Sequence, residues 1–187
     1  MRTTFDKELT DLHGQLVALG RTVRAQLEDA LVALANRDTD AAERIIRRHR
    51  RVDQASAEVE WGLLRILALQ APVAGDLRLV AGLLHVNEHL ERMGGLCANV
   101  AKAIPGLATR PPPTEVLVTL NEMGTHVRRV VMASLACLAD GDAAAAERLP
   151  AIDQAVDVGE QVRFIVTGEV RELLPPKAAR IPADARR

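Results

Sequence analysis

The stretch from Ala68 to Ile104 constrains the fold most, because apolar residues recur along it at alternating spacings of four and three. That spacing places them on one face of an α-helix of about thirty residues. Pro72 is expected to open this helix, where its missing N–H costs nothing. The apolar face consists of Leu79, Leu83, Val86, Leu90, Met93, Cys97, Val100 and Ile104.

A second seam beside this face turns polar halfway along the helix. Its members are Leu77, Val80, Leu84, Asn87, Glu91, Gly95 and Ala98. A carboxylate beside an apolar core is costly unless it is paired or bound to a cation. Glu91 is therefore the first candidate functional residue, and we expect it to have a partner in the fold.

Composition and periodicity together predict an all-α protein of long antiparallel helices. The 187-residue chain has no tyrosine, two phenylalanines and one tryptophan, whereas strands are usually rich in aromatic and β-branched residues. Five helices are expected. The first runs from Thr3 or Thr4 to Asn36, the second from a cap at Asp38 or Asp40 past Ile66, and the third over 68–104. The fourth runs from near Thr114 to Asp140, and the fifth from Ala143 to about Leu174.

An internal repeat and a proline-rich segment predict the domain organisation. Between Gly20 and Arg44, eleven of 25 residues recur 104 positions later. The segment Pro105–Pro113 is expected to be a non-helical linker. We therefore predict a three-helix repeat over 1–108, an abbreviated two-helix second repeat over 109–174, and a disordered tail over 175–187.

Two alignments of the end of the chain remain open. One aligns Asp153 with Gly95 and Asp157 with Asn99, which implies that about 46 residues of the second repeat are absent. The other aligns 152–155 with 52–55 and needs no deletion. We prefer the first alignment, and both leave the second repeat with two long helices.

Charge and motif content exclude several classes of function. The net charge of −1 gives no field for collecting nucleic acid, and no apolar run is long enough to span a bilayer. The N-terminus does not have the pattern of a signal peptide. Cys97 and Cys137 occupy apolar helical positions and are expected to be buried thiols. We therefore expect a cytoplasmic protein, and no pattern indicates catalysis.

The third predicted helix resembles the sequence pattern of the PhoU family of phosphate-uptake regulators. The resemblance rests on two segments, ALQAPVAGDLRLV and HLERMGGLCANVAK. It implies a PhoU-like helical bundle. The residues that match the family pattern are Ala74, Asp76, Leu77, Arg78, Glu91, Arg92, Gly94, Asn99 and, shifted by one position, Ala98.

The resemblance also raises the question of metal ions. PhoU proteins carry an E-x-x-x-D pair in each repeat whose carboxylates hold divalent or iron ions, and carboxylates one helical turn apart suit such ions. Here Gly95 stands where the first pair has its aspartate, and Leu149 stands where the second has its glutamate. The remaining half sites are Glu91 with Asn99 and Asp153 with Asp157. The alternative for these residues is pairing with an arginine of another helix.

Two further groups of polar residues are candidates of lower specificity. His85 and His89 lie one helical turn apart, and we interpret them as part of a solvated face. The second group is an arginine cluster with the charge to bind phosphate or an acidic partner. It includes Arg47, Arg48, Arg50 and Arg51.

The resemblance implies a regulatory adaptor rather than an enzyme. The expected partners of such an adaptor are the ATPase and permease of a phosphate-importing ABC transporter and the sensor histidine kinase of the phosphate response. The adaptor would keep this response inactive when phosphate is plentiful. The alternatives are a carboxylate–metal bundle acting as a metal store or oxidoreductase, and a phosphotransfer bundle using His85 or His89.

We also expect a homodimer, because the fourth and fifth helices carry apolar residues on more than one stripe. These residues are Leu117, Leu120, Val127, Val130, Val131, Leu135, Val158, Val162, Ile165 and Val166.

Overall fold

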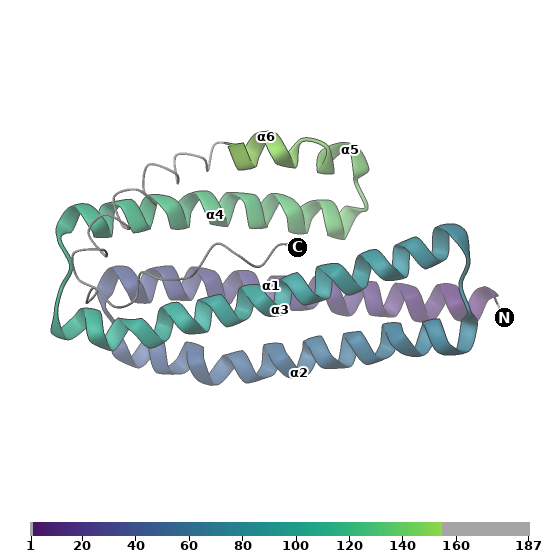
Figure 1. Cartoon of the computed structure of the whole chain (residues 1–187), viewed down its shortest axis with the longest axis horizontal. Coiled ribbons are helices and arrows are strands. Elements are labelled where there is room, and N and C mark those ends of the chain that lie inside the picture. Colours follow the sequence, from purple (N-terminus) through teal and green to yellow (C-terminus); the bar gives the residue numbers. More distant parts are fainter. Residues whose placement is uncertain (1, 155–187) are drawn as a thin grey trace, which may run out of the picture.

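The computed structural model describes residues 2–154, which are helical with short connections and contain no strand. The all-α prediction is confirmed for this part of the chain. Figure 1 shows the arrangement. The helices are α1 (Arg2–Asn36), α2 (Thr39–Gln70), α3 (Ala74–Thr109), α4 (Thr114–Asp140), α5 (Ala143–Ala146) and α6 (Leu149–Gln154). The predicted tail and residues 155–174 lie outside the described residues.

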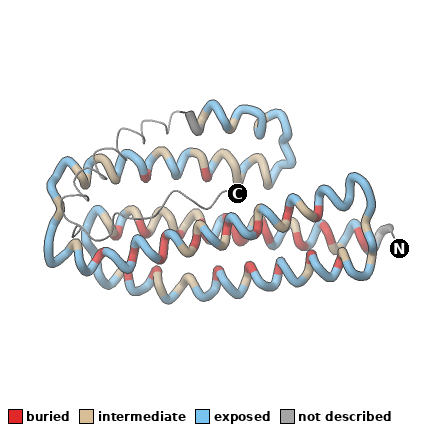
Figure 2. The backbone as a smooth tube through the Cα atoms, viewed as in Figure 1, coloured by how far each residue is buried: buried red, intermediate tan, exposed pale blue. Residues whose placement is uncertain are grey.

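Helices α1, α2 and α3 form an antiparallel three-helix bundle whose core consists of two clusters of buried residues. Figure 2 shows their buried residues on the sides that face one another. At one end the core consists of alanines with Ile45, Cys97 and Ile104. Over the rest it is filled by larger aliphatic residues of all three helices, among them Leu16, Val52, Leu63 and Val80. The apolar faces predicted for the three helices therefore meet one another.

The helix caps follow the internal repeat. Asp38 is the N-cap of α2, and its Oδ1 accepts a hydrogen bond from the Ala41 N–H at 2.9 Å. Asp142, 104 positions later, caps α5 and accepts from the Ala145 N–H at 2.8 Å. An aspartate in this position satisfies one of the free N–H groups of the first helical turn. The same residue type therefore begins the following helix in the same way at both positions.

The repeat also determines how α4 packs against α1. A Cβ atom on Gly20 would overlap the side chain of Leu135, and a Cβ on Gly124 would overlap that of Leu31. Each glycine thus receives the leucine of the other repeat, so that two antiparallel helices approach closely at two equivalent points (Figure 1). His13 reinforces the contact, with its Nε2 atom 2.8 Å from the Leu138 carbonyl oxygen.

The buried seam of α3 agrees with the predicted one at four of its eight positions. At the other four, the buried residue is the one directly after the predicted residue in the sequence. Leu79 and Val100 are 49% and 38% exposed. The buried residues at the four shifted positions are Val80, Asn87, Gly94 and Ala101, each smaller than leucine or polar. They permit closer helix approach than leucines would. The observed seam has the regular spacing of three and four and consists of Val80, Leu83, Asn87, Leu90, Gly94, Cys97, Ala101 and Ile104.

The predicted linker is shorter than expected, because α3 continues through Pro105 to Thr109. Ile104 is fully buried and holds this turn against the bundle. Thr109 Oγ1 donates to the Gly106 carbonyl oxygen at 2.9 Å near the end of the helix. The prediction of a non-helical Pro105–Thr109 was therefore wrong, since tertiary packing outweighs the cost of one proline, and the connection is reduced to residues 110–113.

The predicted fifth helix is interrupted. Residues 147 and 148 form a turn between α5 and α6. Pro150 explains the break, because it lacks an N–H and is tolerated only in the first turn of a helix, which is where it lies in α6. α6 packs along α4 (Figure 1).

None of the helices in the described part of the chain is both long and apolar enough to cross a membrane.

Replacing Pro105 with alanine is expected to stabilise the protein. The substitution restores an N–H that can donate to the Ala101 carbonyl oxygen, and it removes a helix breaker. The free energy of unfolding should rise by about 1–2 kcal/mol in urea denaturation, after allowance for the greater entropy of the unfolded chain. Pro111→Ala, in the connection, is the matched control and should be neutral or slightly destabilising. A loss of stability in Pro105→Ala would contradict the helical assignment of this turn.

Candidate functional site

Three metal-ligating side chains meet between α2 and α3. His49, Asp53 and Glu91 each offer one ligand atom, and these atoms lie within 4.8 Å of one another. The His49 Nε2 atom is 3.4 Å from Asp53 Oδ1. The His49 side chain is 19% exposed and that of Asp53 50% exposed. The cluster therefore sits at the edge of the core, with a partly buried imidazole and a half-exposed carboxylate.

Helix geometry explains why these residues meet. His49 and Asp53 are one turn apart on α2, so they share a face. Val52 between them is fully buried and fixes the rotation of α2. Gly94 faces this turn: a Cβ there would lie 2.9 Å from a Val52 methyl carbon and 3.5 Å from His49 Nδ1. The missing side chain thus lets the His49 ring lie against α3, beside Glu91.

A buried glutamine stabilises the same turn of α3. The Gln26 side chain of α1 is fully buried, and its Nε2 donates to the Gly94 carbonyl oxygen at 3.0 Å. One turn before Glu91, Asn87 Nδ2 donates to the Ser56 carbonyl oxygen at 3.1 Å. These bonds tie α3 to α1 and to α2 on either side of Glu91 and hold its backbone in place.

The residues present do not fit the paired carboxylates that the family resemblance implies. Gly95 has no side chain one turn after Glu91. The His49 Nε2 atom lies 3.7 Å from the point where a Cβ of residue 95 would be. The space beside Glu91 is therefore occupied by an imidazole from α2. Among the described ion pairs, none joins an arginine to Glu91.

The structure does not bring the other predicted metal residues to Glu91. Asn99 lies two turns further along α3, is exposed, and accepts from Lys102 Nζ at 3.2 Å. Asp153 belongs to α6, which packs along α4. Asp157 lies outside the described residues. The combination of Glu91, Asn99, Asp153 and Asp157 stays a prediction, and the cluster in the structure shares only Glu91 with it.

The arginine run divides between two environments. Arg47 pairs with Glu43 at 3.1 Å within α2, and Arg48 pairs with Asp29 of α1 at 2.7 Å. Arg50 and Arg51 are exposed. Arg48 thus links α1 to α2, and Arg50 and Arg51 remain the candidates for binding an anion or an acidic partner.

The remaining predicted residues lie on the surface of α3. Asp76 and Arg78 are exposed in its first turns, and Arg92 is exposed one residue after Glu91. His85 and His89 are also exposed, which agrees with their interpretation as a solvated face.

The two cysteines are free thiols in different environments. Cys97 is buried, and this burial raises the pKa of its thiol from 9.0 to about 11. Cys97 is therefore protonated and unreactive near neutral pH. Cys137 is only partly buried.

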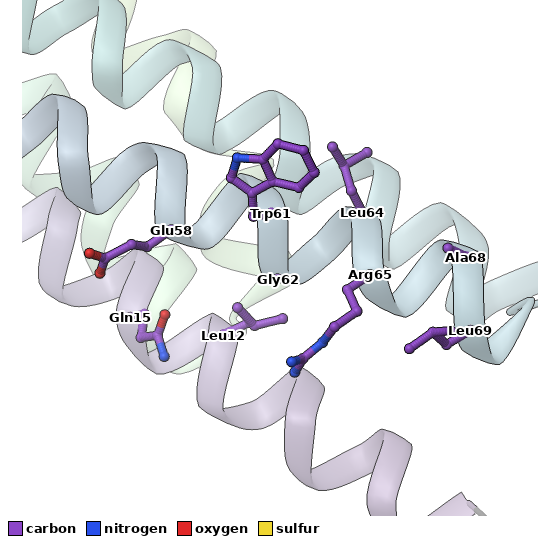
Figure 3. A pocket seen from close by; sticks show the side chains of 9 residues that line it. All are labelled: Leu12, Gln15, Glu58, Trp61, Gly62, Leu64, Arg65, Ala68 and Leu69. Carbon is purple, nitrogen blue, oxygen red and sulfur yellow. The ribbon is translucent and has the colours of Figure 1, made fainter.

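A surface groove around Trp61 was not predicted from the sequence. Trp61 and Leu69 are 73% and 75% exposed. Figure 3 shows them along α2 with Leu64 and Arg65, above Leu12 and Gln15 of α1. The groove has a volume of about 780 Å³. The signal was available, because Val59, Leu63 and Ile66 define the buried face of α2 and place its only tryptophan on the opposite side.

Comparison with known proteins agrees with this architecture. The PhoU domain family matches residues 16–104. A phosphate-specific transport system accessory protein PhoU homolog of Streptococcus pneumoniae is 39% identical over 104 residues, which cover 56% of this chain and 48% of that protein. The homolog of Aquifex aeolicus is 30% identical over 151 residues, covering 81% and 68%. The chain thus spans about half of the first relative and two thirds of the second.

Solved structures give the same result for the fold. The crystal structure of PhoU from Pseudomonas aeruginosa superposes with a TM-score of 0.81 at 28% identity, covering 89% of this chain and 81% of that one. The phosphate transport system regulatory protein PhoU from Streptococcus pneumoniae gives 0.77 at 30% identity, covering 91% and 78%.

The fold of the described residues defines an all-α helical bundle protein. More particularly, the chain belongs to the PhoU family.

The two adjacent glycines of α3 should respond to alanine in opposite directions. A Cβ at Gly94 would collide with the fully buried Val52, so Gly94→Ala should lower the free energy of unfolding by about 1–3 kcal/mol. A Cβ at Gly95 would make only ordinary contact with His49, so Gly95→Ala should raise it by about 0.5–1 kcal/mol through helix propensity. Urea denaturation of both variants provides the measurement. Equal effects would contradict the described packing of α2 on α3.

Proposed function

We propose that the chain is a cytoplasmic regulatory adaptor of phosphate-specific transport, which restrains the phosphate-starvation response through protein–protein contacts and performs no turnover. Its relatives are named as accessory proteins of the phosphate-specific transport system. The proposed partners are the ATPase and permease of a phosphate ABC transporter and the sensor histidine kinase of the response. The carboxylate–metal alternative is not favoured, because Gly95 removes the pair it requires.

The observation that supports a contact-based role is the exposed apolar groove around Trp61. Large aromatic residues are seldom left exposed beside several other apolar side chains unless they bind a partner. Trp61, Leu64 and Leu69 provide such a surface on a rigid helix of the three-helix bundle. Arg65 crosses it and lies 3.8 Å from Glu8, which adds polar groups at the rim. Interfaces commonly combine an aromatic anchor with such a rim.

Substitution of Trp61 tests this role. Purified Trp61→Ala should bind the transporter ATPase or the sensor kinase at least about tenfold more weakly than the wild type, as expected for an aromatic anchor. In cells it should derepress a phosphate-starvation reporter at high phosphate. Val32→Ala, which shortens an exposed apolar residue of α1 away from the groove, is the control and should change neither. Wild-type binding and repression in Trp61→Ala would exclude this surface. Failure of the wild type to bind any of the proposed partners would contradict the proposed function itself.

We also propose a homodimer formed through α4. Apolar residues are exposed on both sides of this helix, among them Val118, Met123, Val127 and Met132. A second copy could cover them, because burial of apolar surface contributes about 25 cal/mol per Å². Sedimentation equilibrium at micromolar concentration should give twice the chain mass. Val127→Asp should give the monomer mass, and Val32→Asp should not. A wild-type protein that sediments only as a monomer would overturn the dimer.

A further inference from the structure

We propose that a depression beside the Trp61 groove receives an arginine side chain of the partner protein that docks on that groove. The depression has a volume of about 480 Å³, and its walls are α2 from Asp53 to Leu64 and α3 from Leu84 to Glu91. This inference rests on the proposed adaptor function and deepens it, because it names the chemistry by which the partner is recognised.

Carboxylates dominate the polar part of this depression. Each helix contributes two of them: Asp53 and Glu60 from α2, and Glu88 and Glu91 from α3. Because α2 and α3 run antiparallel, Glu60 and Glu88 lie at the end away from His49. Both are exposed, and none of the ion pairs in the described part of the chain involves either of them. Negative charge concentrated in a depression attracts a cationic group.

A buried amide in the same depression lacks a donor. Asn87 lines the depression although only 3% of it is exposed. Its Nδ2 atom donates to the Ser56 carbonyl oxygen, so the amide is fixed and Oδ1 is left as an acceptor. This oxygen is buried and has no hydrogen-bond partner among the described residues. A buried acceptor without a donor is destabilising, whereas an N–H group of a ligand that enters the depression satisfies it.

The apolar part of the lining favours a long side chain over a bare ion. Ala57, Leu64 and Leu84 line the same depression. The methylene groups of an arginine can pack against such residues while its charged end reaches the carboxylates. A metal ion makes no contact of this kind. The guanidinium group also has five N–H donors and no acceptor, and it pairs with carboxylates in a planar, bidentate manner that a lysine cannot reproduce.

The depression and the Trp61 groove form one surface. Leu64 lines both of them, and Figure 3 shows Trp61 and Leu64 projecting from the same stretch of α2. Glu60 directly precedes Trp61 in the sequence. Side chains one turn apart on a helix are about 5–6 Å from one another, so one partner helix can place an apolar residue on Trp61 and an arginine between Glu60 and Glu88. The expected partner segment is therefore an amphipathic helix with an arginine beside its apolar face.

Removal of two charges from the depression tests this inference. Full-length Glu60→Gln/Glu88→Gln protein and the wild type are titrated with the purified sensor kinase and with the transporter ATPase, in the presence of a chelator. The affinity for the partner that docks on the Trp61 groove should fall at least about tenfold. Glu115→Gln/Glu122→Gln, which removes two exposed carboxylates of α4, is the matched control and should bind like the wild type. Circular dichroism verifies that each variant is folded.

Substitutions in the same partner identify the cationic group. Each exposed arginine of the partner is changed to glutamine, and binding to both forms of the adaptor is measured. One of these changes should weaken binding to the wild type by a similar factor. It should have little further effect on binding to Glu60→Gln/Glu88→Gln, because groups in direct contact are not additive in a double-mutant cycle.

Three results would overturn the inference. The first is wild-type affinity in Glu60→Gln/Glu88→Gln, and if Trp61→Ala still weakens binding, that result leaves the proposed function intact. The second is the absence of any partner arginine that couples to the two glutamates. The third is loss of wild-type binding on addition of the chelator alone, since the depression would then act through a metal ion. A wild type that binds none of the partners contradicts the proposed function and this inference together.

Discussion

The close approach of α2 and α3 at Gly94 is the contact on which the rest of the site depends. Since Gly94 has no side chain, fully buried Val52 packs directly against the backbone of α3. Gln26 then reaches the Gly94 carbonyl oxygen from α1, so all three helices of the bundle meet at one turn. The same contact places His49 beside Glu91. Core packing and the candidate metal site are therefore consequences of one missing Cβ atom.

Much of the fold could be predicted from the sequence, because long helices with regular apolar spacing have few alternatives. The caps at Asp38 and Asp142, and the repeat that pairs Gly20 with Gly124, are both local patterns. The buried seam of α3 was harder to predict from apolar spacing. Asn87 is buried because it donates a hydrogen bond to α2, and Gly94 because the helices approach closely there, and neither residue is strongly apolar. Pro105 remained helical because Ile104 anchors the turn, which is a tertiary effect.

The site was only partly predictable. Glu91 was identified because a carboxylate beside an apolar seam needs a partner, but its neighbours His49 and Asp53 are about forty residues earlier on another helix. No local spacing connects them. His49 interrupts the apolar seam of α2, and that interruption becomes informative only when Gly95 is known to face it. Trp61 was missed for a different reason: the apolar spacing of Val59, Leu63 and Ile66 already places it on the face of α2 opposite the core, and this signal was overlooked.

A crystal structure of the Gly94→Ala variant beside that of the wild type tests the central claim most directly, namely that close packing at Gly94 brings His49 beside Glu91. The variant should show α2 and α3 further apart at Val52, with the His49 ring displaced from Glu91. An unchanged separation of the two helices, with His49 still beside Glu91 in the variant, would contradict the account.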